Sequence, residues 1–262
     1  MAAPAVSRLL AGLVAGLTVP ALAWADPTAH ACSAPTALLR LSQPLPRVAE
    51  RLARHEPITI VAIGSSSTAG AGASSPAASY PSRLAIELKA RFPRETFKVI
   101  NRGINGEEVS DMLARFADGV IKEKPDLVLW QVGTNSVLRN HPVAPAGLLI
   151  HEGVRQIKAI GADVMLIDPQ FAPKVIAKPG VEEMVNLISA SAKQDNINAF
   201  QRFAVMRYWR EAANIPFSAF LSPDELHMND WSYGCLAKLL GGAIAEAATR
   251  GVASARATLT GR

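Results

Sequence analysis

Residues 58–70 read ITIVAIGSSSTAG, an apolar run that passes directly into a short loop of serine and glycine. The run Ile58–Ile63 has the length and the β-branched composition of a buried strand. A buried strand that ends in a small polar loop is a natural place to present a nucleophilic hydroxyl group. The loop offers three candidates, Ser65, Ser66 and Ser67, although a purely structural turn would have the same composition.

The rest of the chain repeats this alternation of apolar runs and loops. Further strand-like runs are Phe97–Asn101, Leu127–Val132, Val164–Ile167 and, more weakly, Ile197–Phe200. Apolar residues with helical spacing fill the gaps, at Leu84–Phe92, Val109–Phe116, Leu149–Ile157, Val185–Ile188 and Trp231–Thr249. Strands that alternate with helices predict the α/β class, with a central parallel sheet covered on both faces as a three-layer α/β/α sandwich.

Ligand sites of such sheets lie beyond the carboxyl ends of the strands. Three loops occupy that position, Gly64–Gly70, Gly103–Gly106 and Gly133–Asn135, and we expect them to gather on one rim. Other polar residues that follow strand ends could line a pocket, but we expect them to be solvated loop residues: Arg102, Glu107, Asp168 and Gln170.

Two residues near the C-terminus complete a candidate catalytic set. Asp224 stands three positions before His227, and Asn135 follows directly on the third apolar run. Serine, asparagine and an Asp/His pair, in that order, predict a hydrolase that works through an acyl-enzyme. The alternatives are structural, because Asp224 could cap the following helix and Asn135 could cap a turn.

Composition and motifs exclude several other classes of protein. The chain has 262 residues, 49% hydrophobic and 19% charged, which predicts one ordered domain and not a disordered chain. Its net charge of +5 is spread without a basic run, so we expect no nucleic-acid partner. A phosphate-binding loop is excluded, because Lys and Ser/Thr do not follow Gly70. A zinc motif that begins at His151 is excluded as well, because Arg155 stands where the second histidine belongs. We therefore expect neither a metal nor a cofactor.

The N-terminus reads as a secretory signal peptide over residues 1–25. Arg8 precedes an apolar stretch from Leu9 to about Trp24, and small residues at Ala23 and Ala25 suit cleavage. A retained membrane anchor is the alternative, but the stretch is short and Pro20 interrupts it. We expect an N-terminal arm at 26–56, a catalytic domain at 57–250, a frayed C-terminal tail at 251–262, and a periplasmic or secreted protein without stable membrane insertion after cleavage.

The chain has two cysteines, Cys32 and Cys235. Two thiols in an exported chain pair readily, so we expect a disulfide between the arm and the last helix. Two unrelated thiols are the alternative.

Four blocks of the sequence resemble those of the SGNH hydrolases, also called the GDSL esterase/lipase family. Gly64–Gly70 resembles the first block, Gly-Asp-Ser-x-Thr-x-Gly, with Ser66, Thr68 and Gly70 in register. Ser65 stands where that family usually has an aspartate, which is not the triad acid. Asn101–Gly106, Gly133–Asn135 and Asp224–His227 resemble the later blocks, in the correct order.

The resemblance implies a role for each matched residue and a flavodoxin-like fold. Ser66 would be the nucleophile, His227 the general base and Asp224 the acid that orients the histidine. The N–H groups of Ser66 and Gly106 and the Asn135 amide would form the oxyanion hole. The expected function is a serine esterase that removes short acyl groups, acetyl above all, from a small ester or an envelope or extracellular glycan. The alternatives are a lysophospholipase or thioesterase of the same family, or an inactive glycan-binding envelope protein on this scaffold.

Overall fold

The computed structural model describes Met1 and residues 30–260, with side chains described up to residue 250. The predicted signal peptide at 1–25 therefore lies, apart from Met1, outside the described residues. One compact unit begins at Cys32 and contains every element discussed below.

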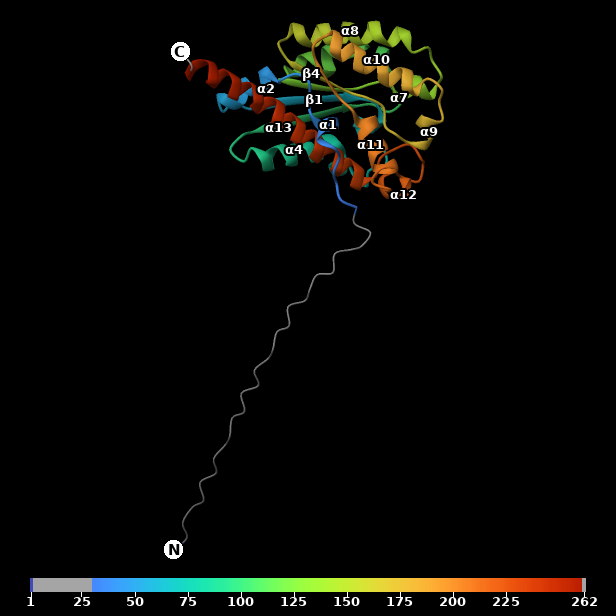
Figure 1. The fold of residues 1–262 in the computed structure, drawn as a ribbon, viewed down its shortest axis with the longest axis horizontal. Coiled ribbons are helices and arrows are strands. Elements are labelled where there is room, and N and C mark those ends of the chain that lie inside the picture. The colour runs from blue at the N-terminus through green and yellow to red at the C-terminus, as the bar shows by residue number, and fades with distance from the viewer. Residues whose placement is uncertain (2–29, 261–262) are drawn as a thin grey trace. The chain divides into compact units, whose positions relative to one another are not determined.

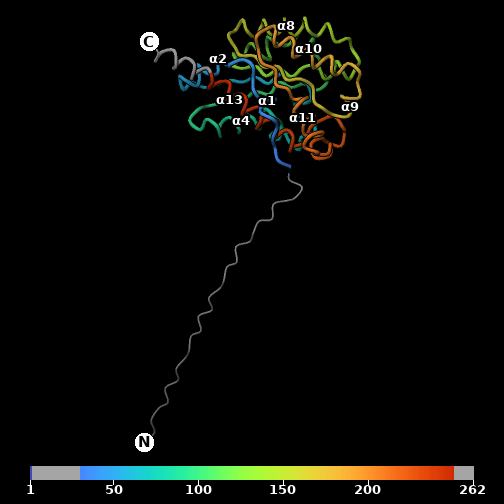
Figure 2. The backbone as a smooth tube through the Cα atoms, viewed as in Figure 1, coloured from blue at the N-terminus to red at the C-terminus, as the bar shows by residue number. Residues whose placement is uncertain are grey.

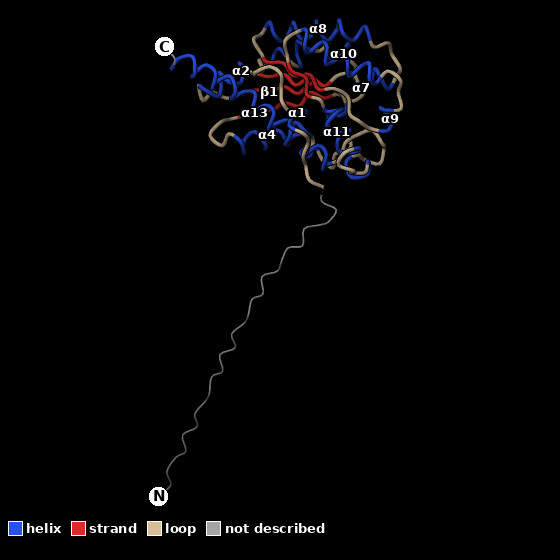
Figure 3. The backbone as a smooth tube through the Cα atoms, in the orientation of Figure 1, coloured by secondary structure: helices blue, strands red, loops and turns tan. Residues whose placement is uncertain are grey.

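Five parallel strands form the central sheet, and the prediction of the fold class is confirmed. Their order is β2-β1-β3-β4-β5, so the chain starts in the interior of the sheet and winds outward in both directions. Figure 3 shows the strands between layers of helices. The strands are β1 (Ile58–Gly64), β2 (Phe97–Gly103), β3 (Leu127–Gln131), β4 (Asp163–Ile167) and β5 (Asn198–Phe200).

Helices cover both faces of this sheet (Figure 1). One layer contains α2 (Pro46–Ala53), α4 (Tyr80–Arg91) and α13 (Asp230–Thr260), with the short α1 (Thr36–Leu39) beside them. The other layer contains α5 (Val109–Ala114), α8 (Ala144–Ala159) and α10 (Val181–Gln194). Because both faces of the central strands are covered, the strands are continuous apolar runs instead of alternating ones. Ile60, Val61, Leu129 and Leu166 are among their fully buried side chains.

The long helix α13 packs along α4, which lies on β2 (Figure 2). Its backbone stays helical to Thr260, past Gly251, where the predicted tail begins. One glycine weakens a helix by about 1 kcal/mol, but the alanine-rich residues that follow favour the helical state. No helix in the described part of the chain is both long enough and apolar enough to cross a membrane.

Short helices and 3₁₀ turns connect these layers. They are α3 (Ser66–Ala69), α6 (Phe116–Gly119), α7 (Thr134–Leu138), α9 (Pro173–Ile176), α11 (Arg202–Glu211), α12 (Phe217–Phe220) and the 3₁₀ turns Pro76–Ala78 and Ile121–Glu123. The sequence did not predict α11. Its apolar residues Phe203, Met206 and Trp209 are buried and have helical spacing, and the charged Arg202 is buried beside them.

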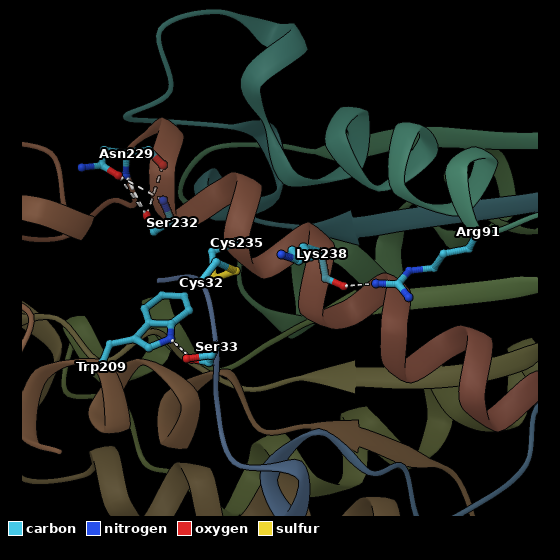
Figure 4. Close-up of a disulfide and its surroundings, with 8 residues drawn as sticks. All are labelled: Cys32, Ser33, Arg91, Trp209, Asn229, Ser232, Cys235 and Lys238. Atoms are coloured by element: carbon cyan, nitrogen blue, oxygen red, sulfur yellow. Dashed lines mark hydrogen bonds between the residues drawn. A yellow bond between two sulfur atoms is a disulfide. The ribbon is translucent and has the colours of Figure 1, made fainter. Parts of the chain in front are cut away.

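The N-terminal arm is fastened to the domain at several points. A disulfide joins Cys32 to Cys235 on α13, and the indole N–H of Trp209 donates to the Ser33 carbonyl at 2.9 Å (Figure 4). Farther along, the Asn198 side chain on the edge strand β5 exchanges two hydrogen bonds with the backbone of Gln43. The arm thereby covers the β5 edge of the sheet.

Candidate active site

Three side chains from two distant segments of the chain form one line of hydrogen bonds. His227 Nε2 lies 2.8 Å from Ser66 Oγ, and His227 Nδ1 lies 2.5 Å from Asp224 Oδ2. Ser66 is the first residue of α3, directly beyond β1. The nucleophile, base and acid that the sequence indicated are therefore adjacent in space, in the order that proton transfer from serine to histidine requires.

The carboxylate of Asp224 is held by its own loop. Oδ1 accepts the backbone N–H groups of Leu226 at 3.0 Å and His227 at 2.9 Å, and the Ser222 hydroxyl at 2.6 Å. Burial alone would raise the pKa of Asp224, but these hydrogen bonds outweigh it and hold the pKa well below its usual value. Asp224 thus stays ionised beside the imidazole.

A different residue caps the last helix, so the structural alternative for Asp224 does not apply. Asn229 Oδ1 accepts the backbone N–H of Ser232 at 3.2 Å, while the Ser232 hydroxyl accepts the N–H of Asn229 at 3.1 Å (Figure 4). This reciprocal pair satisfies the start of α13. Asp224 therefore bonds to His227 and to its own loop, and does not cap α13.

The other two serines of the loop point away from the histidine. Ser65 is buried, and both its N–H and its hydroxyl donate to Gln131 Oε1, each at 2.9 Å. The Ser67 hydroxyl donates to Gln170 Oε1 at 3.3 Å. Ser66 is the member of this trio that reaches His227.

The end of β2 packs tightly against α3, the helix that begins at Ser66. A Cβ atom on Gly103 would lie 2.1 Å from the backbone nitrogen of Ala69, so only glycine fits there. The Asn101 amide also donates to the Thr68 carbonyl at 2.8 Å. These contacts bring the loop after β2 alongside Ser66.

Gly106 and Asn135 meet in this same region. Gly106 has φ of +81°, a left-handed conformation that favours glycine, and the Asn135 amide donates to the Glu107 carbonyl at 2.8 Å. That bond uses one of the two amide hydrogens of Asn135 and leaves the other for a ligand. Within the described residues, the backbone N–H groups of Ser66 and Gly106 donate to no protein acceptor.

A cluster of buried polar side chains lies beneath the rim, with Gln170 at its centre. Its Oε1 accepts the Arg202 guanidinium at 3.0 Å and the Thr134 hydroxyl at 3.1 Å, and its Nε2 donates to the Leu226 carbonyl at 3.3 Å. Together with its bond from Ser67, Gln170 contacts the segments that carry Ser66, Asn135 and His227. The expectation that Gln170 is a solvated loop residue is wrong, because these partners lie under the rim and enclose it.

Asp168 is also buried, again contrary to expectation. Burial raises its pKa to about 7, while the N–H of Phe203 donates to its carboxylate at 2.8 Å. The buried Arg202 next to it donates to the Asp168 carbonyl at 2.9 Å, and burial lowers the pKa of this guanidinium. The sequence offered no signal for this contact, since both residues lie in separate apolar segments.

The side chains of Arg102 and Glu107 bond to residues other than Ser66, Asp224 and His227. Arg102 pairs with Glu123 at 2.5 Å, and the Glu107 carboxylate accepts two hydrogen bonds from Arg115 Nε, at 2.8 and 2.9 Å. His151 pairs with Asp195 at 2.6 Å. In the described part of the chain, no three His, Cys, Asp or Glu side chains are grouped as metal ligands.

A family model matches residues 31–250, nearly the whole of the unit described above, and its description is the Non-GDSL lipase-like family. The chain belongs to this family. Ser65, which replaces the aspartate of the Gly-Asp-Ser-x block, is one departure from the GDSL pattern that the sequence shows.

Individual relatives of this family member are esterases. A curated acetylxylan esterase from Geobacillus stearothermophilus is 41% identical over 54 residues, which are 21% of this chain and 25% of that protein. A two-domain esterase active on acetylated mannans superposes with a TM-score of 0.70 at 21% identity, over 80% of this chain and 56% of the other. The chain thus spans a quarter to about half of the length of these two relatives.

A variant of an acetyl xylan esterase from the same Geobacillus species has a similar fold. It superposes with a TM-score of 0.61 at 22% identity, over 71% of this chain and 94% of that one. The family model thus describes the chain as lipase-like, and the relatives that it resembles carry the names of esterases.

Proposed function

We propose that this protein is an acetyl esterase of SGNH type that acts on acetylated glycans through an acyl-enzyme on Ser66. The observation that carries the proposal is the hydrogen-bonded line from Asp224 through His227 to the Ser66 hydroxyl. An inactive binding protein on this scaffold would have no need for an ionised acid, an oriented imidazole and a hydroxyl in this order.

The reaction follows from these positions. His227 Nε2 takes the proton of the Ser66 hydroxyl while Oγ bonds to the acetyl carbonyl carbon. The N–H groups of Ser66 and Gly106 and the free amide hydrogen of Asn135 stabilise the oxyanion. The C–O bond to the sugar then breaks, and His227 returns its proton to the departing sugar oxygen.

Deacylation repeats the same steps with water as the nucleophile. His227 removes a proton from water, the hydroxide bonds to the acetyl carbon, and acetic acid leaves as Ser66 regains its proton. Asp224 stays ionised throughout and stabilises the imidazolium that forms in both halves. No step requires a cofactor.

Two observations support a glycan as the acyl acceptor. The curated relative acts on acetylxylan by its name, and one of the similar structures is described as active on acetylated mannans. Apart from these two, an open cavity of about 580 Å³ lies next to the loop that carries Asp224 and His227, although neither residue lines it. It is lined by Gly72, Pro173, Phe217, Ser218, Leu221, Ser222, Pro223, Glu225 and Asn229.

Export to the periplasm or the exterior is part of the proposal. It rests on the apolar segment after Arg8 and on the disulfide between Cys32 and Cys235, which suits an oxidising compartment. An exported acetyl esterase would meet acetylated polymers directly. Fusion of residues 1–40 to a reporter enzyme that is active only outside the cytoplasm tests this part.

The test of the activity compares acyl chain lengths and polymers. We expect the highest kcat/KM for p-nitrophenyl acetate within a series of increasing chain length, and release of acetate from acetylated xylan or mannan. A Ser66→Ala protein is the matched control for spontaneous hydrolysis. A preference for octanoyl or longer esters, with no acetate released from either polymer, would contradict the glycan assignment and favour a lipid esterase.

A further inference from the structure

Glu108 and Arg139 form an ion pair at the edge of the site that the triad does not use. Arg139 Nη1 donates to Glu108 Oε1 at 2.5 Å, and the Ser136 hydroxyl donates to Glu108 Oε2 at 2.6 Å. Glu108 begins α5, whereas Ser136 and Arg139 belong to α7 and its end. We call this pair the clamp, because it links the loop after β2 to the helix after β3.

The clamp acts on the two groups that would hold the oxyanion. Arg139 Nη2 donates to the Gly106 carbonyl at 2.8 Å, and the Asn135 amide donates to the carbonyl of the next residue, Glu107, at 2.8 Å. Gly106 lacks a Cβ and lies at φ of +81°, so its own side chain does nothing to restrict its backbone. Contacts from other residues must therefore fix the position of Gly106, and Arg139 supplies one at the carbonyl, in the peptide unit that follows the candidate N–H.

The carboxylate of the clamp is mostly shielded from water. The Glu108 side chain is 14% exposed, although that of Arg139 is 46% exposed. Burial would raise the pKa of Glu108, but hydrogen bonds from Ser136, Arg139 and His141 lower it below its usual value. The Glu108 side chain also accepts the backbone N–H of Asp111 as the N-cap of α5. A shielded carboxylate with these four donors is better ordered than an ordinary surface ion pair.

A second arginine supports the loop from its other side. Arg115 donates to the Glu107 carboxylate and, at 2.8 Å, to the Arg102 carbonyl at the end of β2. The segment from Arg102 to Glu108 is therefore held at both its flanks. Arg139 differs from Arg115 because it bonds directly to the glycine that carries the candidate donor.

We propose that Arg139 and Glu108 are positioning residues of the oxyanion hole. They keep the Gly106 N–H and the Asn135 amide at the distance and orientation that binding of one oxyanion requires. The inference rests on the proposed function. A donor that is displaced by about 1 Å loses most of its effect on the transition state, with rate losses of up to roughly 100-fold. The clamp acts through other groups and does not touch the substrate.

The first experiment measures Arg139→Ala and Glu108→Gln with p-nitrophenyl acetate. We expect kcat to fall about 10- to 100-fold in Arg139→Ala while KM changes little, because the oxyanion forms only in the transition state. The fall should be smaller in Glu108→Gln, which keeps the shape of the side chain. Arg155→Ala is the matched control, since it removes a similar arginine, paired with Glu152 on the surface of α8, and should leave both constants unchanged.

The second experiment separates positioning from general support of the fold. Addition of guanidinium to Arg139→Ala should restore part of kcat. Arg139→Ala should also lower kcat by a smaller factor in an Asn135→Ala background than in the wild type, because one of the two donors that it positions is already absent. Arg139→Lys should be impaired too, because one ammonium cannot bond to Glu108 and Gly106 in the planar geometry of guanidinium.

The outcomes are distinguishable. An active wild type whose Arg139→Ala variant keeps kcat within about twofold, or loses it additively with Asn135→Ala, would overturn the clamp alone. A wild-type protein that hydrolyses no ester and takes up no fluorophosphonate would overturn the proposed function, and the clamp with it. Unchanged unfolding midpoints in the variants, together with a loss of kcat, would support the proposal.

Discussion

His227 Nε2 lies 2.8 Å from Ser66 Oγ, although 161 positions of sequence separate the two residues. Ser66 is fixed by the start of α3, and His227 by a short loop whose two ends are paired, with the Ser222 N–H donating to the His227 carbonyl at 2.8 Å. A contact between two rigidly held groups should respond sharply to loss of either one. The first predictions follow from it.

Ser66→Ala should abolish ester hydrolysis and labelling by a fluorophosphonate probe, because the acyl group would have no oxygen to which it could be transferred. The fold should remain, since the Ser66 hydroxyl bonds to His227 and not to the core. Mass spectrometry of the labelled protein and its thermal unfolding check both statements.

Ser65→Ala is the control for this assignment. Ser65 is buried and donates twice to Gln131, so we expect a loss of about 1 kcal/mol in the free energy of unfolding. The variant should still take up the probe. Loss of labelling in a folded Ser65→Ala protein, with labelling retained in Ser66→Ala, would place the nucleophile one residue earlier.

His227→Ala should lower kcat by several orders of magnitude, and Asp224→Asn by somewhat less. An asparagine amide can face His227 Nδ1 with a donor, which would stabilise the wrong tautomer. Asp230→Asn is a matched control, because Asp230 accepts hydrogen bonds from the backbone and hydroxyl of Ser74 and does not bond to His227. Near-normal turnover in His227→Ala would rule out its role as the base.

Asn135→Ala should lower kcat by about 10²- to 10³-fold with little change in KM. The reason is that its free amide hydrogen meets the oxyanion and not the ground-state carbonyl oxygen. Steady-state kinetics with p-nitrophenyl acetate decide the matter. A rise in KM at constant kcat would instead assign Asn135 to substrate binding.

Local sequence patterns were sufficient to predict the sheet and the layers. Each predicted strand lies within one residue or two of β1 to β5, because fully buried strands are distinct apolar runs in a sequence whose helices are amphipathic. The rim followed from the rule that loops after parallel strands share an edge. Ser66, Asn135, Asp224 and His227 could be chosen because they matched blocks of known order.

The contacts beneath and beside the rim could not be predicted in this way. Gln170 connects to Ser67, Arg202 and Leu226 through bonds between segments that have no fixed spacing in sequence. The burial of Arg202, the first residue of α11, could not be predicted either, because a charged residue at that position is usually exposed. One signal was present for the clamp: Arg139 stands four residues after Asn135, one helical turn away. Its partner Glu108 had none.

The disulfide between Cys32 and Cys235 should stabilise the protein strongly. It closes a loop with a sequence separation of 203, for which the chain-entropy model gives an upper figure of about 5 kcal/mol. Intact mass with and without reductant tests the bond in protein recovered from the periplasm. A Cys32→Ser variant should then unfold at a lower urea concentration, and equal midpoints would contradict a stabilising role.

Asp163, the first residue of β4, has a carboxyl group that should make the stability of the protein depend on pH. Burial raises the pKa of its carboxyl to about 6, even though the Val48 N–H donates to it at 3.0 Å. Because this folded-state value lies above the usual value near 4, the native protein holds a proton that the unfolded chain releases. The contribution of Asp163 to stability is therefore complete below about pH 4 and is lost as the pH rises through about 6.

Asp163→Asn should remove this dependence, since an asparagine oxygen can still accept the Val48 N–H and never ionises. Relative to the wild type, the variant should gain up to about 3 kcal/mol in the free energy of unfolding between about pH 4 and about pH 8. Asp168, with its pKa also raised, contributes equally to both proteins and cancels. Urea unfolding at the two pH values measures the difference. Asp118→Asn is the control, because the Asp118 side chain is 89% exposed. If wild type and Asp163→Asn change in parallel with pH, the Asp163 carboxyl does not titrate as described.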